Sequence, residues 1–210
     1  MLDLGGRPLV VWSVAAAAEA TTLSRVILST DDHEIASVAG SCGCEVPFQR
    51  PATLATDTAS IYDVLFHALE ALSEPYDYIV LLQATSPFRT GADIDACVRT
   101  CIAEDVPACV SVTRVSKPLE WFYSVDARGS LRKVMPGDSA RRQDSSVVVT
   151  PNGAVYVARP NWLAKTRRFI ADETRAYMMP PERSIDIDTD LDLLFARAIL
   201  AEREVTHTNR

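Results

Sequence analysis

Residues 76–104, YDYIVLLQATSPFRTGADIDACVRTCIAE, contain the pattern that decides the fold. The stretch opens with a short apolar run, passes through a polar turn at Ser86-Pro87, and ends in a segment with apolar residues at helical spacing. A short Val/Ile/Leu-rich run followed closely by an amphipathic helix is typical of an α/β protein. Repeats of this unit would build a sheet that is covered by helices.

The same alternation runs along most of the chain. Helices are predicted from about residue 8 and over 32–40, 58–72 and 91–104, and strands over 25–30, 44–48, 76–84 and 107–115. The pattern resumes later with strands at 152–160, 176–180 and 184–188, a short helix, and a last helix to about residue 204. We therefore expect a single α/β domain over 1–210, with a mostly parallel sheet covered on both faces.

Residues 116–150 interrupt this alternation. The run WFYSVDARGSLRKV predicts a hairpin with its turn at 126–129, and a polar loop with several arginines follows it. The chain has no internal repeat and no convincing linker on either side. We interpret 116–150 as an excursion from the sheet and not as a second domain.

Composition narrows the class of protein. The 28 acidic and 21 basic side chains give a net charge of -7, so charge gives no reason to expect nucleic acid or anionic lipid as a partner. No apolar stretch approaches the roughly 20 residues that span a bilayer, and we expect no membrane association. The five cysteines show no repeated C-x-x-C spacing, which fits a reducing compartment. We expect a cytoplasmic protein.

Polar residues follow the predicted strands, where ligands bind in open α/β sheets. The amide of Gln83 can both donate and accept hydrogen bonds, and Arg89 either binds an anion or lies in a surface loop. Asn152-Gly153 predicts a tight turn that places an amide beside a strand, with the hydroxyl of Tyr156 on the same face as Asn152. Of the adjacent pair Arg141 and Arg142, only one can face a given site.

Four aspartates alternate near the C-terminus in SIDIDTDLDL. Asp186 and Asp188 share one face of a predicted strand, with Cα atoms roughly 6.5 Å apart, so their carboxylates can converge on Mg²⁺. A strand that is solvated on one side is the alternative, but two uncompensated carboxylates repel each other and a divalent cation relieves this. Asp190 and Asp192 are assigned instead to a helix start that is capped by Thr189.

Six motifs, taken in order, resemble the acylneuraminate cytidylyltransferases, also called CMP-sialic acid synthetases. They are STDDHEI, RPATLATDTAS, LLQATSPFRT, RRQD, NGAVYV and SIDIDTDLDL, and the resemblance covers about residues 4–200. It implies a Rossmann-like nucleotide-diphospho-sugar transferase fold and a homodimer formed through the excursion. It also implies transfer of CMP from CTP to the anomeric hydroxyl of a nonulosonic acid sugar, with Mg²⁺ and release of pyrophosphate.

The resemblance also implies roles for individual residues. It places Arg50 and Ala59 against the cytidine, Gln83, Asn152 and Tyr156 against the sugar, Arg142 near the phosphates or the sugar, and Asp186 and Asp188 on the metal. The metal would neutralise the triphosphate and lower the pKa of the attacking hydroxyl, which suits a site without a histidine base.

The chain departs from the family pattern at its start. Family members usually begin with a strand and a glycine-rich, basic phosphate loop, and this chain starts after them. Loss of a central strand predicts unpaired backbone groups on its neighbours and an apolar gap. An upstream start, a gap filled by a partner, and a non-catalytic relative that binds sugar or nucleotide all remain open. Glu120, Val149 and Thr150 also remove positive charge that the family commonly has, which leaves the identity of the sugar open.

Overall fold

The central sheet has four strands in the order β3 (Ile79–Leu81), β7 (Val149–Ala158), β4 (Ala108–Arg114) and β8 (Arg175–Met178). The structure is a computed structural model and describes residues 1–134 and 147–208. Strand β7 runs antiparallel to β3 and β4, and only β4 and β8 are parallel. The sheet is therefore mixed, and the prediction of a mostly parallel sheet is wrong. Antiparallel neighbours do not need the crossover helix that joins parallel strands, and the described residues between β4 and β7 contain a hairpin in place of an α-helix.

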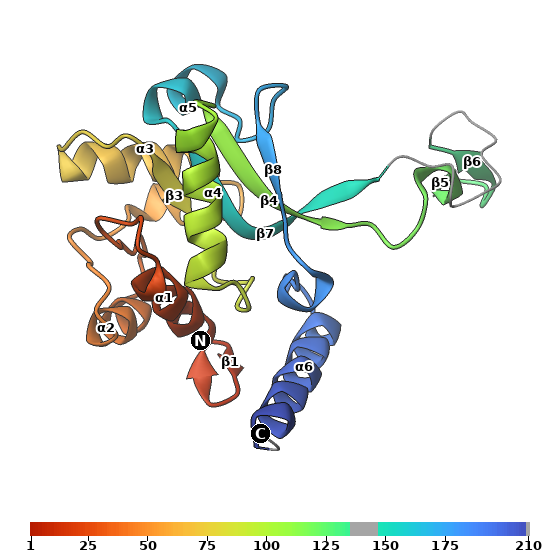
Figure 1. The fold of residues 1–210 in the computed structure, drawn as a ribbon, viewed down its shortest axis with the longest axis horizontal. Helices are drawn as coiled ribbons and strands as arrows, with labels where there is room; N and C mark the ends of the chain where they lie inside the picture. The colour runs from red at the N-terminus through yellow and green to blue at the C-terminus, as the bar shows by residue number, and fades with distance from the viewer. Residues whose placement is uncertain (135–146, 209–210) are drawn as a thin grey trace.

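Helices cover both faces of the sheet, as predicted (Figure 1). They are α1 (Leu9–Glu19), α2 (His33–Ser41), α3 (Ile61–Leu72), α4 (Gly91–Ala103), α5 (Pro160–Thr166) and α6 (Asp190–Thr208). On one face, Cys97 and Cys101 of α4 pack with Val155 and Val157 of β7. On the other face, Leu163 of α5 lies in a second cluster with side chains of α3.

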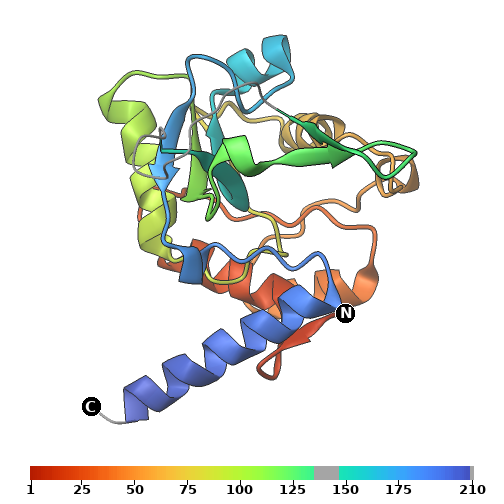
Figure 2. The same ribbon diagram turned by 90° about the vertical axis from the view of Figure 1, so that its right-hand side faces the viewer.

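The last helix is fixed to the opposite end of the chain. A short N-terminal hairpin of β1 (Asp3–Leu4) and β2 (Arg7–Pro8) lies beside α6 (Figure 2). Buried apolar side chains join this hairpin, the turn before α4 and the start of α6; they are Leu4, Leu9, Phe88, Ile187, Leu193 and Ala196. This cluster holds the segment that carries the four aspartates against the sheet end. No helix in the described ranges is long and apolar enough to cross a membrane.

Three of the predicted strands do not form. Residues 25–30 and 44–48 contribute only one parallel bridge, between Ile27 and Glu45. Residues 184–188 belong to no strand, although the Ile187 N–H donates to the Thr85 carbonyl over 2.8 Å. Apolar runs predict extended chain, but a strand also needs a hydrogen-bonded neighbour along its length.

A cavity of about 1930 Å³ lies between the 25–29 segment and β3. Side chains of α1 and α3 also line it. The outer side of 25–29 is bonded to Glu45, and the outer side of β3 is bonded to β7. Among the described residues, no backbone hydrogen bond joins 25–29 to β3 across the cavity. Two sheet edges therefore face each other with a space between them, which we call the edge slot.

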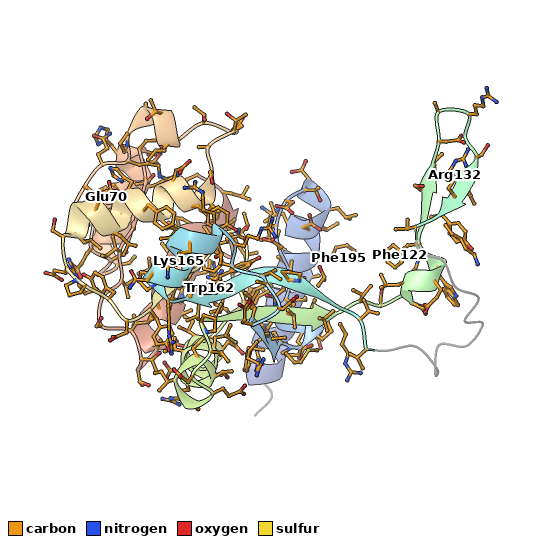
Figure 3. All side chains as sticks on the ribbon, turned by 90° about the horizontal axis from the view of Figure 1, so that it is seen from above. Glu70, Phe122, Arg132, Trp162, Lys165 and Phe195 are labelled. Atoms are coloured by element: carbon orange, nitrogen blue, oxygen red, sulfur yellow. The ribbon has the colours of Figure 1, made fainter. Side chains whose placement is uncertain are left out.

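The excursion forms the predicted hairpin, from β5 (Tyr123–Val125) and β6 (Leu131–Lys133). Its turn closes with a 2.9 Å hydrogen bond from the Gly129 N–H to the Asp126 carbonyl. The hairpin lies away from the body, beyond the ends of β4 and β7 (Figures 1 and 3). In Figure 3, Phe122 and Arg132 mark this hairpin, far from Trp162 and Lys165 of α5.

Candidate active site

Five of the eight predicted site residues line the same cavity, at the ends of sheet segments. They are Arg50, Gln83, Tyr156, Asp186 and Asp188. Gln83 follows β3, Tyr156 lies on β7, and the two aspartates lie in the segment before α6. The sheet ends therefore bring together residues that are more than 100 positions apart in the chain.

The other three residues are not in this group. Ala59 lies in the loop before α3, where its N–H donates to the Thr56 carbonyl over 3.0 Å, and it is not among the cavity residues. Arg142 lies outside the described residues. Asn152 is buried, and its side chain bonds to Ser111 over 2.6 Å and to Ser184 over 2.9 Å, away from the cavity.

Two expectations about Asn152-Gly153 are wrong. The pair lies inside β7 and not in a turn before it, at a register shift where β4 pairs with β7 around Val110 and Val112. A glycine with a positive φ occurs in β-bulges as well as in turns, and Gly153 has a φ of 73°. The bulge breaks the alternation of side chains, so Asn152 and Tyr156 do not share a face: Tyr156 packs against Phe169 on the opposite side.

Gly153 lies where three side-chain oxygens converge. A Cβ atom built on it would be 2.5 Å from Ser86 Oγ, 2.6 Å from Asp186 Oδ2 and 2.8 Å from Gln83 Oε1. Only a glycine fits there without displacing these atoms, so the bulge lets β7 approach the site closely.

Ser86 is a site residue that the sequence analysis treated only as part of a turn. Its side chain is fully buried, and its hydroxyl lies 3.1 Å from Asp186 Oδ1 and 3.1 Å from the Asn152 carbonyl oxygen. This hydroxyl can hold the Asp186 carboxylate in place from behind. A serine between a strand end and a proline is the only signal in the sequence, and it equally fits an ordinary turn.

Asp186 and Asp188 stand on the cavity side of their segment. Ile187 is buried, and Ile185 packs against the same cluster, so the predicted alternation of core and site residues is confirmed. In the described part of the chain, no group of three or more His, Cys, Asp or Glu side chains could hold a metal. Two carboxylates alone still fit Mg²⁺, which usually keeps several waters and takes other ligands from substrate phosphates.

The other two aspartates begin α6, as predicted. Asp190 is the first residue of the helix. Asp192 Oδ2 accepts hydrogen bonds from the Thr189 N–H over 2.8 Å and from its hydroxyl over 2.7 Å, and Thr189 Oγ1 accepts from the Asp192 N–H over 3.3 Å. The bonds from Thr189 lower the pKa of Asp192. This reciprocal pair is a capping box, which separates Asp192 from the two site aspartates.

Tyr156 and Arg50 bring donors to the cavity. Burial, and then the negative charge of Asp186, raise the pKa of the Tyr156 phenol, so its hydroxyl stays protonated and can donate to a ligand. Arg50 is tied to the end of the 25–29 segment, because its Nε donates to Ser29 Oγ over 3.1 Å. The same guanidinium also donates to the Ser29 carbonyl, and a nucleotide would compete with this contact.

A family model described as a cytidylyltransferase matches residues 1–194. The chain belongs to the cytidylyltransferase family. It is 33% identical over 199 residues to the N-acylneuraminate cytidylyltransferase of Escherichia coli, covering 94% of this chain and 47% of the relative. The chain thus spans about half the length of that relative. It is 31% identical over 195 residues to the CMP-N,N'-diacetyllegionaminic acid synthase of Legionella pneumophila, covering 90% and 83%.

The fold agrees with that of a solved structure at low sequence identity. The structure of a CMP:2-keto-3-deoxy-manno-octonic acid synthetase complexed with CTP superimposes with a TM-score of 0.70, covering 96% of this chain and 91% of the other, at 16% identity. The chain therefore has the α/β nucleotide-diphospho-sugar transferase fold, with a mixed central sheet.

Proposed function

We propose that this protein transfers CMP from CTP to a nonulosonic acid and releases pyrophosphate. The observation that carries the proposal is the Asp186/Asp188 pair on one cavity wall with Gln83 and Tyr156, in a chain of the cytidylyltransferase family. Two relatives are named for sialic-type and legionaminic-type sugars, which are both nonulosonic acids. Their names support the substrate class, while the particular sugar is left to experiment.

In this mechanism the described side chains bind and orient the reactants. Asp186 and Asp188 would hold Mg²⁺, which neutralises the triphosphate and lowers the pKa of the attacking sugar hydroxyl. Ser86 keeps the Asp186 carboxylate aimed at the cavity, over 3.1 Å. The Gln83 amide and the Tyr156 hydroxyl offer hydrogen bonds to sugar hydroxyl and carboxylate groups. Arg50 would leave Ser29 to contact the nucleotide, and Arg142 is proposed to act near the phosphates or the sugar.

The direct test is pyrophosphate release with CTP, Mg²⁺ and a panel of nonulosonic acids that includes sialic, legionaminic and pseudaminic acids. We expect turnover with at least one sugar, and none when EDTA is added. Lack of turnover, together with calorimetric binding of CTP or a sugar, would favour the alternative, a non-catalytic binding relative of the same fold.

We further propose that the edge slot accepts one more extended segment as a central strand. Arg25–Ser29 and β3 each have one free edge toward the slot among the described residues, and α1 and α3 wall it with apolar side chains. An extended Val/Ile-rich peptide would form backbone hydrogen bonds with both edges, and its side chains would pack against the apolar side chains of α1 and α3. Such a strand would also place backbone between Arg50, which is bonded to the end of the 25–29 segment, and Gln83, which follows β3.

An N-terminal extension that carries a Val/Ile-rich strand and a linker of about ten residues is expected to stabilise the protein. Burying four or five such side chains contributes roughly 1.5–3 kcal/mol each, offset by ordering the strand, so we expect Tm to rise by about 5–10 °C. Hydrogen exchange of amides in 25–29 and 79–81 should slow. The control extension carries two prolines in the strand, which remove its donors. Equal Tm values for both extensions would contradict the proposal.

We also propose that the β5–β6 hairpin mediates a homodimer. The hairpin and the 3-10 turn before it expose large apolar side chains, with exposed fractions of 56% for Trp121 in the turn, and 66% for Val125 and 69% for Leu131 in the hairpin. Val125 and Leu131 are directly opposite each other in the hairpin, so they form one apolar patch. Exposed apolar patches of this kind mark interaction surfaces.

Replacing both members of this patch, Val125→Lys with Leu131→Lys, is expected to convert the dimer to a monomer. Two buried lysines would place like charges in the interface, where desolvation penalises them. Sedimentation velocity measures the change. The matched control is Ile170→Lys, because Ile170 is 52% exposed on the body of the protein. A double variant that sediments like the wild type would rule out this interface.

A further inference from the structure

Arg89 is a buried cation behind the site. Only 3% of its surface is exposed, so it cannot bind an anion from solution and does not lie in a surface loop as the sequence allowed. One terminal nitrogen donates to Ser13 Oγ of α1 over 2.7 Å, and the other donates to the Gln83 carbonyl oxygen. Its Nε is buried without a hydrogen-bond partner in the described structure.

Burying the Arg89 guanidinium with an unpaired Nε costs free energy of folding. Burial lowers the pKa of Arg89 to about 10, and the charges of Asp186 and Asp93 oppose this shift, so the group remains charged at neutral pH. A buried charge with an unpaired donor costs free energy that an apolar side chain of similar size would not cost. Such groups need another explanation, and placement behind a site is one.

The contacts of Arg89 lead to both Gln83 and Asp186. The Gln83 carbonyl accepts from Arg89 and from the Ser86 N–H over 3.3 Å. Ser86 Oγ lies 3.1 Å from Asp186 Oδ1. The carbonyl oxygen of Thr85, the residue before Ser86 in the turn, accepts a hydrogen bond from the Ile187 N–H over 2.8 Å. The guanidinium therefore clamps the turn 83–86, and this turn holds the aspartate segment.

We propose that Arg89 is a positioning residue, which fixes the turn 83–86 so that the Gln83 amide and the Asp186 carboxylate keep their places in the cavity. The inference rests on the proposed function for its kinetic consequence, but not for its structural one. Supporting groups behind metal ligands typically change affinity or activity by 10–100-fold when they are lost.

The test compares Arg89→Met, which keeps the length without charge or donors, with Arg89→Lys, which keeps the charge. We expect Arg89→Met to lower kcat about 10–100-fold while KM for CTP stays within about twofold, because Arg89 does not line the cavity. Arg89→Lys should recover part of the loss. Amide exchange at Ser86 and Ile187 should become about tenfold faster in Arg89→Met, as the turn loosens.

The matched control is Asp95→Asn. Asp95 is also buried and accepts hydrogen bonds from Thr21 and Thr22, but it has no bond to the turn 83–86. It should lower Tm and leave kcat and the two amides unchanged. If Arg89→Met behaves like Asp95→Asn in both readouts, Arg89 is only a core residue and the proposal fails. If the wild type has no turnover, the proposed function fails, while faster exchange at Ser86 and Ile187 alone would still support positioning.

Discussion

Asp188→Asn is expected to abolish Mg²⁺-dependent pyrophosphate release, with a loss of about a thousandfold or more. The substitution removes one of two carboxylates proposed for the metal, and a metal that stabilises transition-state charge contributes several kcal/mol. Each tenfold in rate corresponds to about 1.4 kcal/mol. Asp188 is exposed, and in the described ranges its carboxylate makes no hydrogen bond or ion pair that holds the fold, so Tm should change little. Steady-state kinetics over a range of Mg²⁺ concentrations measures the effect.

Asp190→Asn is the matched control, because it is only two positions away and is also exposed. It opens α6, where a carboxylate interacts favourably with the helix dipole, so its loss should slightly lower Tm and leave kcat unchanged. Equal losses of activity in the two variants would refute the division of the four aspartates into a metal pair and a helix start.

Gly153→Ala is expected to reduce turnover by about a hundredfold. The new Cβ atom would lie 2.5 Å from Ser86 Oγ and 2.6 Å from Asp186 Oδ2, so the carboxylate or the strand must shift. Displacement of a catalytic group by about 1 Å can cost a hundredfold in rate. The φ of 73° adds strain of roughly 1–2 kcal/mol, which should lower Tm by a few degrees.

Gly43→Ala separates the two effects. Gly43 also has a positive φ, of 87°, but a Cβ atom there would meet nothing within 4 Å. We expect a similar fall in Tm with normal kinetics. If Gly153→Ala shows the same small Tm change and retains full turnover, the three oxygens around Gly153 do not form the site.

The local elements were predictable because their causes are local. Apolar spacing and the residues at the helix starts located α1 and α4, and Thr189 with Asp192 located the start of α6. The alternation around Ile187 also placed Asp186 and Asp188 on the side away from the core. Helices depend on contacts between residues three or four positions apart, so the pattern that predicts them is visible within a short stretch of sequence.

The direction and pairing of the strands depended on the whole chain. Residues 25–30 have a strand-like composition but form only one bridge. A strand also requires a second segment to pair with along its length, and the local sequence does not show which segment that is. The bulge at Gly153 arises from pairing with β4. It places the Asn152 side chain in a buried hydrogen bond with Ser111 and brings Gly153 close to the side chains of Ser86 and Asp186.

By itself, the sequence determined the α/β class of the fold, the placement of Asp186 and Asp188 on the side of their segment away from the core, and the capped start of the last helix, because each depends on residues close together in the chain. Only the tertiary structure decided that the sheet is mixed, that Ser86 supports Asp186, that Arg89 is buried behind the Gln83 turn, and that a slot separates 25–29 from β3. These features depend on contacts between segments tens of residues apart, where a register shift of one residue exchanges the two faces of a strand.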